Sequence, residues 1–447
     1  MKIRAYLFLS ICMLLIPSTQ AQGLEDKLDG IVARYFHEGP GYAIRIDKNG
    51  ETIYRKSVGL AKLASGMPLT NDHVFRIGSI SKQFTAVAIL MLVDRCQIDL
   101  KDPITKYLPD YPTQGERITI EHLLTHTSGI KNYTSMDIWD HEMQKKDLSP
   151  DELINSFKGE KMDFKPGQAF RYNNSGYILL GKIIEKLSNK TYADFLKTEI
   201  FHPLGLKHTS YEDAKTERVT GYSVGQNSEY LEAPHISMTQ PYAAGALVST
   251  TDDLSKWYHA IFSDQILSKE LREKAHSPFT LNNGTQTHYG YGWFLNEVDG
   301  SPVIMHGGGI HGFSTASAFL PKEKLFIVVL ANCDKSPSDK LMKKLAGTAL
   351  GKKFAMPERI ELSTKTLRTY EGSYKLNSDY TIKIYLKGSK LVGRAPGQSE
   401  CELIPIGNQV FFIQQSEEKV KFNMNHKQVV KSLTLYHEGI QIAVKEE

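Results

Sequence analysis

Hydrophobic positions at the start of the chain change from helical to strand-like spacing. Apolar side chains recur every three or four residues from Leu24 to His37, which predicts an amphipathic helix. Two strand-like runs follow at residues 42–47 and 52–60, and Asn49-Gly50 lies between them. Asn-Gly is a strong hairpin signal, because both residues tolerate a positive φ. The opening segment therefore predicts a helix followed by a β-hairpin.

Strand-like runs return much later in the chain, at residues 315–320 and 325–331, and a helical run follows at residues 339–350. A helix and two strands at one end are thus matched by two strands and a helix at the other. We expect the two ends to build one sheet. The residues between them would then form a large, mostly helical insertion.

The insertion opens with a very apolar segment, residues 79–95. Between Phe84 and Val93, Thr85 alone interrupts the run of apolar residues. A helix that is apolar on every side is a buried helix. Ser79 stands where the N-cap residue of this helix is expected.

The pattern changes again beyond Gly351. Residues 353–366 mix charges and include Pro357, as a linker does. From Leu367 onward, short runs alternate apolar and polar residues, for example at residues 380–386 and 440–444. Several short strands at this spacing predict a small antiparallel barrel or sandwich. Residues 367–447 are therefore expected to form a separate β domain.

The N-terminus has the layout of a secretory signal peptide. Lys2 and Arg4 precede the apolar run 5–16, and small residues lead to Ala21. We favour cleavage after Ala21, which makes residues 1–21 the signal and residues 22–352 the first folded domain. An uncleaved anchor is the alternative, but the run is shorter than the about 20 residues of a span. We therefore expect export to the periplasm or beyond, with no stable membrane span after cleavage.

Composition excludes several classes of protein. The chain has 447 residues, of which 41% are hydrophobic and 23% charged, as in ordinary globular proteins. The net charge of +4 gives no basic field, so no nucleic-acid partner is expected. After signal removal Cys96, Cys333 and Cys401 remain, without metal-binding spacing. We expect no disulfide framework, no metal and no cofactor, and one disulfide bridge stays open.

The first candidate for chemistry is the pair Ser79 and Lys82. Residues three apart share one face of a helix. Burial of Lys82 is costly unless the amine has a partner or a task. An apolar environment weakens the charged form of a lysine, which can then help to accept the serine proton. The alternative is a plain capping serine beside a lysine that extends to solvent.

Two further segments carry reactive side chains. In the first, Tyr172 follows a Pro-Gly turn and Asn174 lies two residues beyond it. A tyrosine beside a lysine can have its pKa lowered and can act as a base. In the second, three glycines follow His306. Glycines allow the backbone to approach a reacting carbonyl closely. An ordinary loop and a flexible hairpin are the alternatives for these two segments.

The order and separation of these segments resemble the serine beta-lactamase-related family, over roughly residues 24 to 350. That family includes class C beta-lactamases, D-alanyl-D-alanine carboxypeptidases, D-aminopeptidases and esterases. The stretches that carry the resemblance are 75–85 (FRIGSISKQFT), 118–130 (ITIEHLLTHTSGI), 164–181 (FKPGQAFRYNNSGYILLG), 243–254 (AAGALVSTTDDL) and 289–293 (YGYGW). The stretch 370–374 (YEGSY) resembles a lipocalin-like β domain that is often appended to such hydrolases.

The resemblance implies an α+β fold, with a beta-lactamase/transpeptidase-like antiparallel sheet, a helical subdomain and a small C-terminal β domain. Ser79 would be the acylated nucleophile, and Lys82 and Tyr172 would share the proton transfers. Asn174 would hydrogen-bond the substrate amide and Lys82. His306 and Gly308 would bind substrate. The backbone N–H groups of Ser79 and Gly309 would form the oxyanion hole.

At His306 the sequence departs from the penicillin-hydrolysing pattern, where many members have a lysine. Histidine is mostly neutral at pH 7, which puts a fixed cation for a substrate carboxylate in question. If His306 is neutral, esters and amides without a carboxylate should be preferred. If a neighbouring acid keeps it charged, carboxylate substrates should improve below about pH 6.5.

The activity implied by the resemblance is hydrolysis of an ester or amide through an acyl-enzyme on Ser79. The expected partner is a small-molecule or peptide substrate: a D-amino-acid peptide, a peptidoglycan fragment, a small ester or a beta-lactam. Two alternatives stay open. One is a true beta-lactamase, and the other is a non-catalytic penicillin-binding or cell-wall sensor.

Two rival patterns are weaker. Residues 221–225 (GYSVG) match a nucleophile elbow, but the flanks of Ser223 are polar, whereas an elbow needs a buried strand and a helix. His122 and His126 are four residues apart on an expected helix, yet no glutamate follows the first histidine. We interpret the two histidines as capping or packing residues.

Overall fold

The structure is a computed structural model. It describes residues 17–36, 38–213, 215–263, 265–298, 300–352, 359–377, 380–396, 400–413, 418–425, 429–435 and 441–446. Most of the predicted signal, residues 1–16, lies outside the described residues. No helix within these ranges combines the length and apolar character that a membrane crossing requires. The chain divides into two compact units, Met1–Lys353 and Phe354–Glu447.

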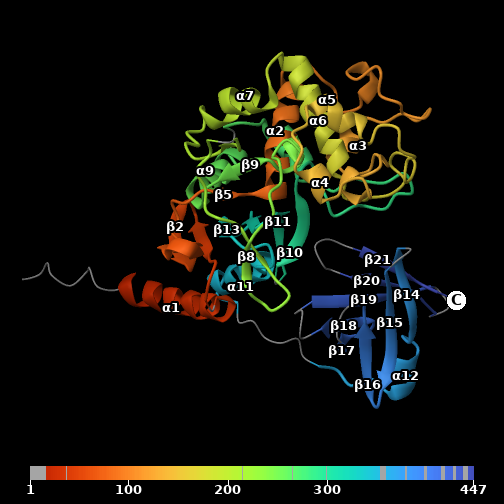
Figure 1. Cartoon of the computed structure of the whole chain (residues 1–447). Coiled ribbons are helices and arrows are strands. Elements are labelled where there is room, and N and C mark those ends of the chain that lie inside the picture. The colour runs from red at the N-terminus through yellow and green to blue at the C-terminus, as the bar shows by residue number, and fades with distance from the viewer. Residues whose placement is uncertain are drawn as a thin grey trace, which may run out of the picture. The chain divides into compact units, whose positions relative to one another are not determined.

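An antiparallel sheet with strand order β10-β11-β12-β13-β1-β2 lies at the centre of the first unit (Figure 1). The strands are β1 (Tyr42–Lys48), β2 (Glu51–Val58), β10 (Phe294–Val298), β11 (Ser301–Ile310), β12 (Phe313–Leu320) and β13 (Leu325–Ala331). The two ends of the unit meet where β1 pairs with β13, from Tyr42 opposite Ala331 to Lys48 opposite Leu325. The prediction of one sheet built from both ends is confirmed.

Alternate residues of β13 serve two hydrophobic cores, because side chains of a strand point to opposite faces in turn. Ile327 and Val329 pack in the core that contains α1 and α11. Phe326 and Val328 pack in the core that contains α2 and α9. The covering helices are α1 (Pro17–Tyr35), α11 (Ser338–Ala349), α2 (Ser81–Asp94) and α9 (Thr251–Ile261). A strand buried on both faces explains the unbroken apolar run in its sequence.

Along the chain, the predicted helical insertion lies between β2 and β10, and α2 to α7 lie together at the top of Figure 1. Besides α2 and α9 it contains α3 (Ile120–Leu124), α4 (His141–Gln144), α5 (Pro150–Asn155), α6 (Asn174–Ser188), α7 (Tyr192–Leu196), α8 (Tyr242–Gly245) and α10 (Lys269–Ala275). Its short strands are β3 (Leu60–Lys62), β4 (Met67–Pro68), β5 (Phe75–Arg76), β6 (Ser210–Tyr211), β7 (Tyr222–Val224), β8 (Tyr230–Glu232) and β9 (Leu247–Ser249).

Helix α2 is buried along most of its length, as the sequence predicts, and every residue from Ser81 to Leu90 is buried. Its start differs from the prediction. The α-helix begins at Ser81, and Ser79 lies in a preceding 3₁₀ turn, Gly78–Ile80, instead of at the N-cap. The Ile80 N–H donates to the Ile77 carbonyl, and Gly78 adopts a φ of +51°. This left-handed glycine turns the chain into α2 with Ser79 at the bend.

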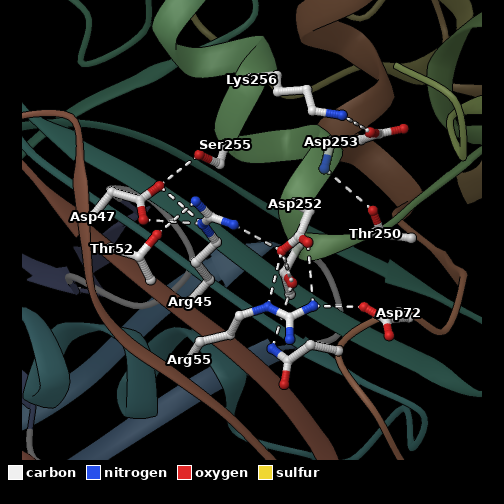
Figure 2. Close-up of polar contacts among 12 residues, drawn as sticks. Arg45, Asp47, Thr52, Arg55, Asp72, Thr250, Asp252, Asp253, Ser255 and Lys256 are labelled. Carbon is white, nitrogen blue, oxygen red and sulfur yellow. Dashed lines mark hydrogen bonds and ion pairs between the residues drawn. The ribbon is translucent and has the colours of Figure 1, made fainter. Parts of the chain in front are cut away.

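A charged network joins the β1–β2 hairpin to α9 (Figure 2). Arg45 donates to Asp47 at 3.0 Å and to Asp252 at 2.8 Å. Arg55 also pairs with Asp252, at 3.2 Å. Ser255 donates to Asp47, which is only 1% exposed, at 2.5 Å. Because the buried carboxylate has both a cation and a hydroxyl partner, the network fixes α9 against the sheet.

In the second unit, β14 to β21 close into an antiparallel barrel. The strands are β14 (Gly372–Asn377), β15 (Tyr380–Lys387), β16 (Lys390–Arg394), β17 (Cys401–Gly407), β18 (Val410–Ile413), β19 (Glu418–Met424), β20 (Val430–Leu435) and β21 (Gln441–Lys445). Tyr374, Phe411 and Phe422 are completely buried in its core. Of the two architectures that the alternating pattern allowed, the barrel is the one formed.

Part of the segment expected as a linker packs on the barrel. Ile360 donates its N–H to the Pro405 carbonyl at 2.9 Å. Helix α12 (Thr364–Arg368) follows, and its Leu367 is buried in the barrel core. The second unit therefore starts its ordered contacts before Leu367, where the sequence pattern becomes strand-like.

The three cysteines that the structure describes form no disulfide bond. Cys96, Cys333 and Cys401 are all free thiols, respectively exposed, buried and half-buried. The one disulfide that the sequence left open is therefore not formed between them.

Candidate active site

Ser79 lies at the junction between β5 and α2, and its side chain is partly exposed. Strand β5, which precedes this turn, is anchored by a buried ion pair. Arg76 on β5 donates to Glu212 through two nitrogens, at 2.7 and 2.8 Å. Bidentate arginine–carboxylate pairs hold a defined geometry. Ser79 is therefore partly exposed, while the strand that leads to it is held by a buried ion pair.

Lys82 lies one helical turn beyond Ser79 and is completely buried. Its Nζ lies 3.1 Å from the Ser79 Oγ and donates to the Ala244 carbonyl at 2.8 Å. Burial lowers the pKa of Lys82 well below its usual value. This shift favours the neutral form of the amine, whose Nζ is held between the Ala244 carbonyl and the Ser79 Oγ.

The Ala244 carbonyl is held in place by a set of bonds between α2 and the α8–β9 segment. Thr85 donates to the Ala243 carbonyl at 2.6 Å, and the Leu247 N–H donates to Ser81 at 3.1 Å. The sequence carried no sign of a role for Ala244, because a backbone carbonyl leaves no mark on residue type.

Tyr172 places its ring against the lysine, with Lys82 Nζ 4.8 Å from the ring centroid. Its hydroxyl is buried and has no hydrogen-bond partner among the residues that the structure describes. Burial raises the pKa of Tyr172 above its usual value, and the nearby Ser79 hydroxyl opposes this only in part. The lowered pKa that the sequence allowed for Tyr172 is therefore wrong, because burial raises it. Tyr172 stays protonated and can donate a proton.

Asn174 is the first residue of α6, and its amide is directed elsewhere than expected. Its Nδ2 donates to Thr134 at 3.1 Å, and its backbone N–H donates to Asn132 at 3.0 Å. Within the described residues no hydrogen bond joins Asn174 to Lys82. The expected hydrogen bond to the lysine is therefore not formed, and the amine is bonded to Ser79 and Ala244 instead. Asn174 remains half-buried and keeps only its predicted role toward substrate.

His306 on β11 is buried and neutral. Its Nδ1 lies 2.6 Å from the Gly307 carbonyl, so this nitrogen carries the hydrogen. Its Nε2 lies 3.0 Å from the Tyr289 hydroxyl and accepts that proton. Burial, which is the largest cause, lowers the pKa of His306 to about 3. Of the two expectations for His306, the charged form is wrong.

The glycines of β11 turn backbone groups toward an open edge. Pairing with β10 ends at Met305, opposite Phe294, while pairing with β12 runs on to Ile310. Ile310 and Phe313 close a two-residue loop, and such closing pairs are hydrogen-bonded. Alternation along the strand then points the N–H and C=O of Gly309 away from β12. Gly309 is exposed, so its N–H is available to a ligand.

This edge of β11 lies directly beside the serine turn. A Cβ on Gly308 would lie 2.0 Å from the Ile77 carbonyl oxygen, and a Cβ on Gly78 would lie 3.1 Å from the Gly309 nitrogen. Thr315 donates to the Ile77 carbonyl at 3.0 Å and joins the two segments. The geometry brings Gly309 next to the Ser79 turn, as an oxyanion hole requires. The role of these N–H groups stays a prediction.

The rival patterns acquire structural explanations. Ser223 lies on β7, donates to Asp334, and is followed by the hairpin to β8, where a nucleophile elbow would have a helix. His122 accepts the Thr119 N–H in a capping box, and His126 accepts the Asn173 N–H at 3.1 Å. The interpretation of both histidines as capping or packing residues is confirmed. Within the described ranges no cluster of side chains could hold a metal.

Tyr289 is the functional residue whose role the sequence reasoning missed. It lies in a stretch already noted as family-like, 289–293, but no task was assigned to it. Its hydroxyl donates a hydrogen bond to His306. Its ring centroid lies 4.6 Å from that of His126 and 6.2 Å from that of Tyr172. The signal was present as a motif, but the partner of the hydroxyl is visible only in the folded chain.

The fold and this arrangement define a serine hydrolase of the beta-lactamase type. The family model described as Beta-lactamase matches residues 28–350. Because the match covers more than half of the chain, the protein belongs to this serine beta-lactamase/transpeptidase family. Its members are serine hydrolases, among them amidases, penicillin-binding proteins and beta-lactamases.

Individual relatives match over most of their length. Penicillin-binding protein 4* of Bacillus subtilis is 31% identical over 418 residues, which cover 88% of this chain and 92% of that protein. The octameric penicillin-binding protein homologue from Pyrococcus abyssi has a TM-score of 0.68 and 25% identity, and the match covers 95% of this chain and all of that one. The D-amino acid amidase of Ochrobactrum anthropi has a TM-score of 0.65 and 25% identity, over 74% and 99% of the two chains.

Gly308→Ala tests the close approach of β11 to the serine turn. The added Cβ meets the Ile77 backbone oxygen and the Thr315 hydroxyl at 2.0 and 2.5 Å, so we expect the first unit to lose about 1–3 kcal/mol of stability. Gly309→Ala is the matched control, because its Cβ meets nothing within 4 Å. Denaturation of the two variants should differ accordingly. Equal stability of both would contradict the observed approach.

Proposed function

We propose that the protein is an exported serine hydrolase that forms an acyl-enzyme on Ser79 and releases the acyl group to water. One observation carries the proposal: the buried amine of Lys82 lies 3.1 Å from the Ser79 Oγ with a lowered pKa. A serine hydroxyl needs an adjacent base to act as a nucleophile. Export rests on the predicted signal peptide, residues 1–21.

Acylation follows from the protonation states of the three side chains. Ser79 Oγ attacks the substrate carbonyl while its proton moves to the neutral Lys82 Nζ. The oxyanion that forms accepts hydrogen bonds from the backbone N–H groups of Ser79 and Gly309. As the bond to the leaving group breaks, the leaving nitrogen or oxygen takes a proton from the Tyr172 hydroxyl. The ammonium of Lys82 then returns its proton to Tyr172.

Deacylation repeats the sequence with water as the nucleophile. Water loses a proton to Lys82 as its oxygen attacks the ester carbonyl, and the bond to the Ser79 oxygen then breaks as that oxygen takes the proton from the Lys82 ammonium. No charge needs to enter from solvent, because the two residues start and end neutral. Positioned acid–base groups of this kind contribute about 10²–10⁴-fold each.

The substrate that we propose is an ester or amide that carries no obligatory carboxylate, such as the amide of a D-amino acid or a short acyl ester. The buried, neutral His306 supports this class, because it supplies no cation where many relatives have a lysine. Similarity to a D-amino acid amidase supports it as well. The similarity to a penicillin-binding protein keeps beta-lactam acylation as the competing outcome.

Ser79→Ala tests the nucleophile. We expect it to abolish covalent labelling by a fluorophosphonate and turnover of a chromogenic ester, because no acyl-enzyme can form. Ser223→Ala is the control, since Ser223 lies on β7 in a hairpin, with no helix after it, and its hydroxyl is engaged by Asp334; this variant should behave like the native protein. An adduct located on Ser223 by mass spectrometry would overturn the assignment.

Lys82→Ala and Tyr172→Phe test the shared proton transfer. Each should lower the acylation rate by about 10²–10⁴-fold. The double variant should lose little more than the worse single variant, because residues that act as one unit are not additive. Stopped-flow acylation measures all three. Losses that multiply would show two independent roles and contradict the relay.

A panel of substrates at several pH values tests the substrate class. With a pKa of about 3, His306 stays neutral from pH 5 to 8, so the preference for D-amino-acid amides and p-nitrophenyl esters over D-Ala-D-Ala peptides should not change with pH. The rate on every substrate should fall at low pH, because protonated Lys82 cannot accept the serine proton. Nitrocefin turnover above all esters and amides would favour a beta-lactamase instead.

A further inference from the structure

His126 occupies a backbone position that usually belongs to glycine. It follows α3 with a φ of +59°. Its N–H donates to the Leu123 carbonyl at 3.4 Å, and the next residue, Thr127, donates to the His122 carbonyl at 2.9 Å. These two bonds define a Schellman motif, in which the left-handed position is most often glycine and sometimes asparagine. A histidine there is strained, which suggests that its side chain has a task.

The task is visible in the contacts on either side of Tyr172. The Arg171 N–H donates to the His126 carbonyl at 3.0 Å, and the Asn173 N–H donates to the His126 Nδ1 at 3.1 Å. One residue therefore holds the backbone immediately before and immediately after the tyrosine. The His126 ring also lies 4.3 Å from the Tyr172 ring, measured between centroids.

The surroundings leave Asn173 without a substitute for this acceptor. His126 is 1% and Asn173 4% exposed, so water does not readily replace the imidazole. A buried N–H that loses its acceptor destabilises the folded protein, because its lost hydration is not replaced. The Nε2 of His126 has no hydrogen-bond partner among the described residues. The side chain thus acts on the protein through Nδ1 and through its ring face.

We propose that His126 is a positioning residue that holds the backbone around Tyr172, so that the tyrosine hydroxyl stays beside Ser79 and Lys82. The proposal rests on the function proposed above for these three residues. It assigns His126 no contact with substrate and no proton transfer. Displacement of a catalytic group by about 1 Å can lower a rate about 10²-fold, so loss of this hold should appear in kcat more than in KM.

The proposal predicts opposite outcomes for two variants of similar shape. In His126→Asn, the Oδ1 can accept the Asn173 N–H in the place of Nδ1, and asparagine tolerates the left-handed backbone. In His126→Leu, the shape of asparagine is kept but the acceptor is lost. We expect the asparagine variant to stay within about tenfold of the native kcat and the leucine variant to lose on the order of 10²-fold, with similar KM values.

His126→Gly covers the case in which leucine prevents folding, because glycine removes the acceptor while relieving the left-handed backbone. It should fold and lose kcat as the leucine variant does. A folded leucine or glycine variant with native kcat would overturn the proposal. So would an asparagine variant that loses as much kcat as leucine does at equal thermal stability.

Amide hydrogen exchange separates this proposal from the proposed function. The Asn173 amide should be protected in the native protein and in His126→Asn, and should exchange faster in His126→Leu or His126→Gly. This readout needs no substrate. If the native protein neither hydrolyses the substrate panel nor becomes labelled, the proposed function fails. If the Asn173 amide exchanges at the same rate in the native protein and in all variants, the proposal that His126 holds this backbone is overturned.

Discussion

The burial of one amine sets the conditions for the rest of the site. Lys82 is completely buried in a helix whose first ten residues have no exposed side. Burial lowers the pKa of Lys82 well below its usual value. An ammonium ion in such a place would be costly, whereas a neutral amine with two hydrogen-bond partners is not. The apolar character of α2 therefore favours the neutral form of Lys82, which the proposed proton transfer requires.

The same burial determines how the surrounding groups behave. The rings of Tyr172 and His306 lie 5.9 Å apart between centroids. Burial disfavours the charged form of each: the pKa of the tyrosine rises and that of the histidine falls to about 3. The site thus combines a neutral base, a protonated phenol and a neutral imidazole. The neutral state of His306 is the feature on which the proposed preference for uncharged esters and amides rests.

The sheet contributes to this chemistry through the absence of side chains. Because Gly308 has no Cβ, β11 can lie against the Ile77 carbonyl, and the exposed Gly309 N–H comes beside the serine turn. The charged network of Arg45 and Asp47 secures the other end of the sheet to α9, whose Trp257 stacks on Phe84 of α2 at 3.9 Å. Sheet and helix are in this way held together on both sides of Ser79.

The sequence by itself determined the elements and the list of reactive residues. Periodicity located the hairpin at Asn49-Gly50, the buried helix after Ser79 and the alternating strands of the barrel, because these signals are local. Tertiary structure decided the properties of the residues: the direction of the Tyr172 pKa, the neutrality of His306, and the absence of a hydrogen bond between Asn174 and Lys82. These depend on desolvation and on partners distant in the chain, such as the Ala244 carbonyl and the Tyr289 hydroxyl. A sequence pattern records which groups are present, but only the fold establishes how much water and which neighbours each of them has.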